Sequence, residues 1–73
     1  MKVKFTAASN IYGGPSDIIK EVNFLEDAFE LARDKAFRQK LGVFSKVDSY
    51  VVSFPKNDTD CNVSIMIYDD YIE

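Results

Sequence analysis

The stretch NFLEDAFELARDKAFRQKLG, residues 23–42, decides the fold because it carries the strongest periodic signal in the chain. On a helical wheel of about 100° per residue, its small and apolar residues fall within one stripe about 100° wide. The stripe contains Leu25, Ala28, Phe29, Ala32 and Ala36. These residues predict one amphipathic helix over residues 24–41, and the small alanines allow it to lie close against a sheet.

Both ends of this predicted helix carry suitable residues. Asn23 can cap the N-terminus, with Glu26 three residues later as in a capping box. Basic residues gather toward the C-terminal end, which the helix dipole favours, so the only basic cluster of the chain is explained by a helix end. Gly42 is suited to the position just after the last turn.

Two large apolar residues, Phe37 and Leu41, do not fit the stripe. They lie about 120° and about 160° from its centre, on the side that should face water. Either the helix ends early and both side chains pack under the following loop, or both are exposed. We favour the first alternative.

Four stretches outside the helix are expected to form strands, three because they alternate apolar and polar residues, which is typical of half-buried strands, and residues 17–22 as the return strand of a hairpin with the first. They are residues 2–7, 17–22, 46–54 and 61–68. Turn-forming residues separate the first two stretches, and PKNDTD (55–60) separates the last two as a hairpin loop would. We therefore expect a single α+β domain over residues 1–73, a two-layer fold in which a four-stranded antiparallel sheet (ββαββ) has one helix packed on one face.

The first and fourth strands are expected at the centre of this sheet. Residues 63–67 are the most apolar strand segment and would be prone to aggregation at an edge. The residues expected to form the core are Phe5, Leu25, Phe29, Ala32, Val52, Phe54, Ile65 and Ile67.

One helix leaves the other face of the sheet uncovered, and this open face holds the first candidate site. Val51, Met66 and Tyr68 fall on it among polar neighbours. If adjacent, they would form a modest apolar patch of the kind that marks partner surfaces. Scattered apolar residues are also normal on any protein surface, so the sequence favours neither a partner surface nor an ordinary surface over the other.

The C-terminus is the second candidate site. Asp69, Asp70, Tyr71 and Glu73 combine an aromatic side chain with three carboxylates, which could occupy a partner surface meant for phosphates. The simpler interpretation, which we favour, is that acidic residues at a terminus keep a small domain soluble.

The composition excludes several chemistries. With no His and one Cys among 73 residues, the chain has no Cys/His zinc cluster, no Ser-His-Asp triad and no internal disulfide. The carboxylates lack the spacing of a calcium loop. We therefore expect no enzymatic activity, no metal and no cofactor.

The charge balance and the hydropathy indicate which kinds of partner and which cellular location to expect. Nine Lys and Arg against twelve Asp and Glu leave a net charge of -3, which disfavours direct nucleic-acid binding. No stretch approaches the roughly 20 apolar residues of a membrane span, and no apolar segment follows the N-terminal lysines. A single unpaired Cys61 suits a reducing compartment, so a cytoplasmic location is expected.

The ββαββ plan, the start KVKFTAASNIYGG (2–14) and the helix start NFLEDA (23–28) resemble those of small phage and mobile-element accessory proteins. These include inhibitors of bacterial defence such as anti-CRISPR proteins. The resemblance implies a non-enzymatic protein that binds a larger host protein or nucleoprotein complex in the host cytoplasm. Two alternatives stay open: a homodimer that buries the open face, and a nucleic-acid-binding sheet module.

Overall fold

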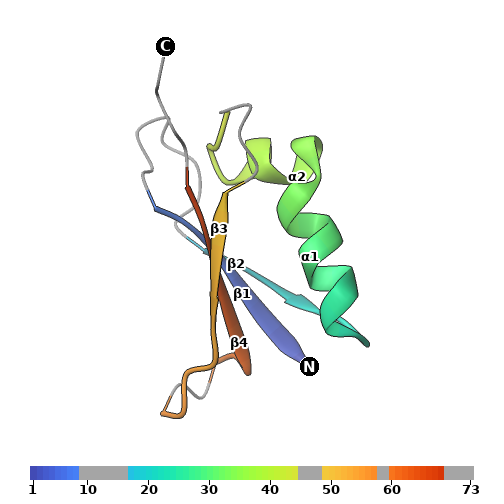
Figure 1. The fold of residues 1–73 in the computed structure, drawn as a ribbon, viewed down its shortest axis with the longest axis vertical. Coiled ribbons are helices and arrows are strands. Elements are labelled where there is room, and N and C mark those ends of the chain that lie inside the picture. Colours follow the sequence, from blue (N-terminus) through green and yellow to red (C-terminus); the bar gives the residue numbers. More distant parts are fainter. Residues whose placement is uncertain (9–16, 45–48, 58–59, 69–73) are drawn as a thin grey trace.

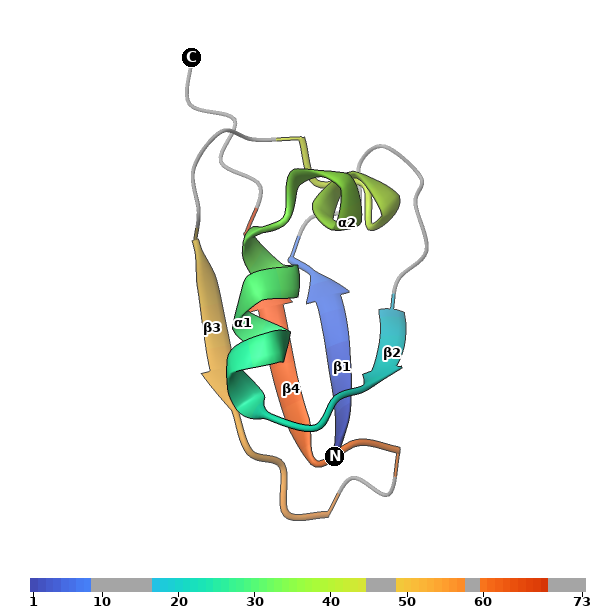
Figure 2. The same ribbon diagram turned by 90° about the vertical axis from the view of Figure 1, so that its right-hand side faces the viewer.

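The computed structural model describes residues 1–8, 17–44, 49–57 and 60–68. Their elements are β1 (Lys2–Ala7), β2 (Asp17–Glu21), α1 (Leu25–Arg33), α2 (Lys35–Lys40), β3 (Tyr50–Ser53) and β4 (Val63–Ile67). Both helices lie on one face of a four-stranded sheet, with α1 running along the strands and α2 across one end (Figures 1 and 2). The α+β class is confirmed, whereas the helical part contains two helices where one was expected.

The sheet has the strand order β2-β1-β4-β3, so β1 and β4 are central as expected. The antiparallel pairing expected within each predicted hairpin is confirmed, because β1 pairs antiparallel with β2 and β3 pairs antiparallel with β4. β1 and β4 run parallel, with Phe5 opposite Ile65. The sheet is therefore mixed, and the prediction of a purely antiparallel sheet was wrong. In Figure 2 the chain runs up β1, down β2, up α1, across the end of the sheet in α2, down β3 and up β4, so β1 and β4 point the same way.

The predicted single helix is broken at Asp34. This residue has an extended backbone, with φ -72° and ψ 122°, and it lies between α1 and α2. Its carboxylate Oδ2 accepts a hydrogen bond from the backbone N–H of Phe37 at 3.2 Å, so it caps the N-terminus of α2. Aspartate favours caps over helix interiors because its short side chain bonds nearby backbone N–H groups. The chain thus turns where a straight helix was expected.

This break carries Phe37 and Leu41 into the core. Phe37 is 4% exposed and Leu41 is 0% exposed. The ring of Phe37 meets that of Phe5 edge to face, with ring centroids 4.7 Å apart. The early helix end and the burial of both residues, which we favoured, are confirmed, whereas their expected place under a loop was wrong: Phe37 lies in α2 and Leu41 is the C-cap of α2. Ala36, which the continuous wheel placed in the buried stripe, is exposed because the wheel does not continue past Asp34.

The helix ends match the sequence-based expectations in part. Phe24 is the N-cap of α1 and makes no side-chain capping bond, so the expected cap by Asn23 was wrong. At the end of α2, Gly42 has a φ of 85°, its N–H donates to the carbonyl of Gln39, and the N–H of Val43 donates to that of Arg38. This pair of bonds is a Schellman motif, which needs the left-handed backbone that glycine adopts without strain.

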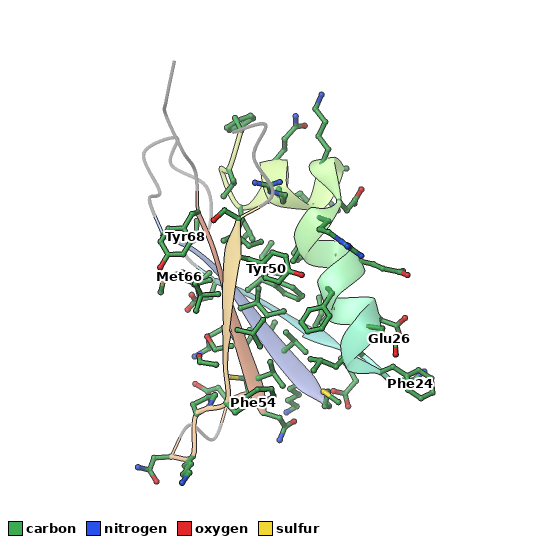
Figure 3. The ribbon with its side chains drawn as sticks, viewed as in Figure 1. Phe24, Glu26, Tyr50, Phe54, Met66 and Tyr68 are labelled. Atoms are coloured by element: carbon green, nitrogen blue, oxygen red, sulfur yellow. The ribbon has the colours of Figure 1, made fainter. Side chains whose placement is uncertain are left out.

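The core lies between the sheet and the helices. Of the expected core residues, Phe5, Ala32, Ile65 and Ile67 are buried, whereas Leu25, Phe29 and Val52 are half-buried against them. Phe54 is 64% exposed, so its assignment to the core was wrong. It follows the last residue of β3, at the lower end of the molecule in Figure 3, where the sheet is no longer covered.

Candidate protein-binding surface

The face of the sheet away from the helices brings three of the predicted site residues together. Val51 and Met66 lie directly opposite each other in the β3–β4 pair. Tyr68 follows Met66 by two residues on the same side, and its N–H donates to the carbonyl of Ser49 at 2.9 Å, which extends the ladder. Figure 3 shows Met66 and Tyr68 on the side away from α1, whereas Tyr50 points toward it. We call Val51, Met66 and Tyr68 the open-face patch.

All three side chains of the open-face patch are accessible. Val51 is 54% exposed, Met66 40% and Tyr68 37%. The cause is strand alternation: in β4 the odd-numbered residues are buried under the helices, so Met66 and its neighbours of the same parity face outward. The β3–β4 pair, with Tyr68 directly after β4, therefore presents an aliphatic, a thioether and an aromatic side chain on one face.

Polar groups border the open-face patch. Thr6 stands beside Met66 in the parallel pair, and Asp17 stands beyond Thr6 in β2. The Thr6 hydroxyl donates to Oδ1 of Asp17 at 3.0 Å, which fixes this border. On the adjoining row the hydroxyl of Ser53 donates to the carbonyl of Ser64 at 3.5 Å. An apolar centre with a polar rim is the usual anatomy of a protein–protein interface.

Sequence analysis missed a fourth exposed apolar residue on this face, Ile19. It lies opposite Lys4 in the β1–β2 pair and is 47% exposed. Lys4 and Thr6 of β1 separate it from the open-face patch. In a strand over residues 17–21, Ile19 shares a side with Asp17 and Glu21, so its exposure could have been predicted once that strand was assigned.

The charges on the open face are mixed. Lys2 lies opposite Glu21, and the N-terminal ammonium of Met1 lies 3.6 Å from the Glu21 carboxylate. Tyr68, which directly follows β4, is the aromatic residue that the described part of the chain places on this face. Stacked aromatics in a basic groove, which single-stranded nucleic acid requires, are not assembled there.

The second candidate site lies outside the described residues. Asp69, Asp70, Tyr71 and Glu73 follow Tyr68 directly in the sequence. Their contribution to binding stays a prediction, to be tested by substitution.

Other chemistry has little support in the part of the chain that the structure describes. No group of three or more His, Cys, Asp or Glu side chains there could hold a metal ion. Cys61 is 4% exposed and lies just before β4, as a small buried residue. None of the described helices combines the length and the hydropathy needed to cross a membrane.

Comparison of the chain with protein-family models, with curated proteins and with solved structures finds no match. The functional interpretation therefore depends on the surface of the molecule itself.

Proposed function

We propose that this protein is a non-enzymatic binding protein whose open-face patch occupies the surface of a larger host protein or nucleoprotein complex. The mode of action would be that of phage or mobile-element inhibitors of bacterial defence, such as anti-CRISPR proteins, in the host cytoplasm. The observation that carries the proposal is the adjacency of Val51, Met66 and Tyr68 on a sheet face that no described element covers.

The residue types of the open-face patch suit a protein partner. Tyrosine is enriched among the residues that dominate binding energy, since it buries a large ring and keeps a polar end. Methionine adapts its shape to the opposing surface. Met66 lies in β4, and Tyr68 extends the β3–β4 ladder through its N–H. The backbone that carries both side chains is therefore already ordered, and binding loses little of its conformational entropy.

The open-face patch is too small to form a whole interface by itself. A stable interface buries about 800 Å² on each partner, which three side chains cannot supply. The three residues would form the central apolar cluster, and the surrounding polar residues of β1 and β2 would form the rim. Substitution at the centre should therefore weaken binding more than substitution at the rim.

The acidic balance indicates what the partner surface would carry. With a net charge of -3 and three carboxylates in the five residues after Tyr68, this chain would be attracted to a basic surface. Proteins that bind nucleic acid present such surfaces. A small acidic protein bound there would exclude the nucleic acid by occupying its site.

The test is a capture experiment with a matched pair of variants. Tagged wild-type protein, Met66→Lys and Phe24→Lys are each used as bait in bacterial lysate, and captured proteins are identified by mass spectrometry. Both positions are exposed, at 40% and 69%, and Phe24 lies at the start of α1, away from the open face (Figure 3). Circular dichroism of each variant is the control for folding.

A partner captured by the wild type and by Phe24→Lys, but lost by Met66→Lys, would support the proposal. Equal capture by all three baits would place the binding surface elsewhere. Capture of no stable partner by the wild type would reject the binding function.

A further inference from the structure

The strand β3 lies at the outer edge of the sheet, and its hydrogen-bonding groups alternate in direction. The N–H of Tyr68 donates to the carbonyl of Ser49, so Ser49 and Tyr68 form a hydrogen-bonded pair. In an antiparallel ladder such pairs recur at every second residue, which makes Val51–Met66 the next one. The backbone groups of Tyr50 and Val52, and of Phe54 after them, therefore point away from β4 and off the edge.

This edge lacks the protection that the opposite edge has. β2 carries Asp17, Lys20 and Glu21, and charges along an edge discourage pairing with another strand. Residues 50–54, YVVSF, carry no charge and no proline. The outer side of β3 is thus a short, uncharged template for one more strand. Figure 2 shows no described element beyond β3, and α1 does not reach past it.

The side chains at this edge form an incomplete aromatic group. Phe29 of α1 stacks on Tyr50, with ring centroids 5.9 Å apart and an interplanar angle of 29°. Phe54 lies four residues after Tyr50, on the same side of the strand by alternation, and is 64% exposed. One large ring is therefore left in water on the same side of β3 as a ring pair that is already packed, at the other end of the strand.

We propose that β3 pairs antiparallel with β3 of a second copy of this chain, with Val52 opposite Val52 of the partner subunit. In this register Tyr50 lies opposite Phe54 of the partner subunit, and Phe54 lies opposite Tyr50 of the partner subunit. All of these are residues whose backbone groups point outward, so each pair exchanges two hydrogen bonds. Tyr50 and Phe54 then form cross-strand aromatic pairs on the side of the sheet that carries the helices.

A second copy fits this edge because the edge is complementary to itself. The two-fold register places the exposed ring of Phe54 against the half-buried ring of Tyr50 twice. Because residues 50–54 carry no charge, no like charges face each other along the paired strands. Registers shifted by one residue would set outward-pointing groups against inward-pointing ones and lose the ladder. The contact uses the one uncharged edge of each copy, so assembly stops at a closed dimer.

The dimer leaves the open-face patch uncovered and places two copies of it on one continuous sheet. Its use for two-site binding of a partner rests on the proposed function, whereas the dimer itself does not. Met66 lies on β4, away from the outer edge of β3, so Met66→Lys tests partner binding without changing the dimer contact. The two proposals can therefore fail independently.

The first test measures mass against concentration. The monomer has a mass of 8.3 kDa. In sedimentation equilibrium, the weight-average mass should rise from this value toward twice this value between about 1 μM and about 1 mM protein. Phe54→Glu should raise the dimer dissociation constant by at least about tenfold, since it removes two aromatic pairs and adds like charges. Phe24→Glu is the matched control, at 69% exposure and outside the sheet, and should leave the constant unchanged.

The second test is site-specific and needs no variant. Amide hydrogen exchange at Tyr50 and Val52 should slow as the concentration rises, because these N–H groups become bonded only in the dimer. The amides of Val51 and Ser53 face β4 and should be protected at every concentration. A strict monomer at about 1 mM would overturn the proposal. A dimer whose Val52 amide still exchanges fast, while the open-face patch becomes protected, would overturn it in favour of an open-face contact.

Discussion

Replacing Phe37 by alanine should lower the free energy of unfolding by about 3–5 kcal/mol. Phe37 is 4% exposed, and its ring packs edge to face on Phe5 at 4.7 Å between centroids. Removing the ring forfeits its burial and leaves a cavity that the surrounding core fills only in part. It also removes the aromatic pair, worth about 0.5–1.5 kcal/mol beyond the buried area.

This loss is large for a chain of 73 residues. At about 0.05–0.15 kcal/mol per residue, the total stability is about 4–11 kcal/mol. Urea unfolding followed by circular dichroism is the assay, and with a slope of about 1 kcal/mol/M the midpoint should fall by about 3–5 M. The variant would be close to unfolded without denaturant if the wild type is at the low end of that range.

Phe24→Ala is the matched control because it makes the same chemical change at a position 69% exposed. Its effect should stay within about 0.5 kcal/mol. A Phe37→Ala effect as small as that of Phe24→Ala would refute the reasoning. It would mean that the helix continues past Asp34 and that the Phe37 ring faces water.

Two further substitutions test other parts of the account. Gly42→Ala should cost about 1–2 kcal/mol in the same urea titration, since φ is 85° there and a Cβ is strained in that backbone region; an unchanged midpoint would contradict the Schellman ending of α2. Charge reversal at Asp69, Asp70 and Glu73 should weaken partner binding and reduce its dependence on salt. Unchanged affinity in that triple variant would show that the acidic tail only keeps the protein soluble.

The strands could be predicted from the sequence because alternation is a local signal. Residues such as Val3, Phe5, Ile65 and Ile67 show it plainly, and the structure buries all four. The parallel pairing of β1 and β4 could also have been predicted, since in a ββαββ plan of five elements that alternate in direction the first and the last point the same way. The prediction placed these two strands side by side without following their directions.

The helix break was visible in the sequence as a misfit. Phe37 and Leu41 fell on the wrong side of a continuous wheel, and an aspartate stood just before them. A wheel assumes an unbroken backbone, so it could report the conflict but could not place the break. Tertiary packing of Phe37 against Phe5 resolves it, because that contact joins residues far apart in the chain.

The open-face patch was predictable from parity along each strand, whereas the edge properties of β3 were not. Val51 and Met66 fall outward from alternation alone, but their adjacency depends on the register between two strands. The exposure of Phe54 depends on where the helical layer stops, which no periodic pattern encodes. Because Phe54 lies outside the core, its ring is exposed at the outer edge of β3.

The most direct test of the central claim is the dissociation constant of the captured partner for the wild type, Met66→Lys and Phe24→Lys. Isothermal titration calorimetry gives all three values under the same conditions. We predict that Met66→Lys raises the constant by at least about tenfold, or about 1.4 kcal/mol, because it places a charge at the apolar centre of the interface. Phe24→Lys should leave the constant unchanged. Equal constants for all three proteins would contradict the claim that the open-face patch binds the partner.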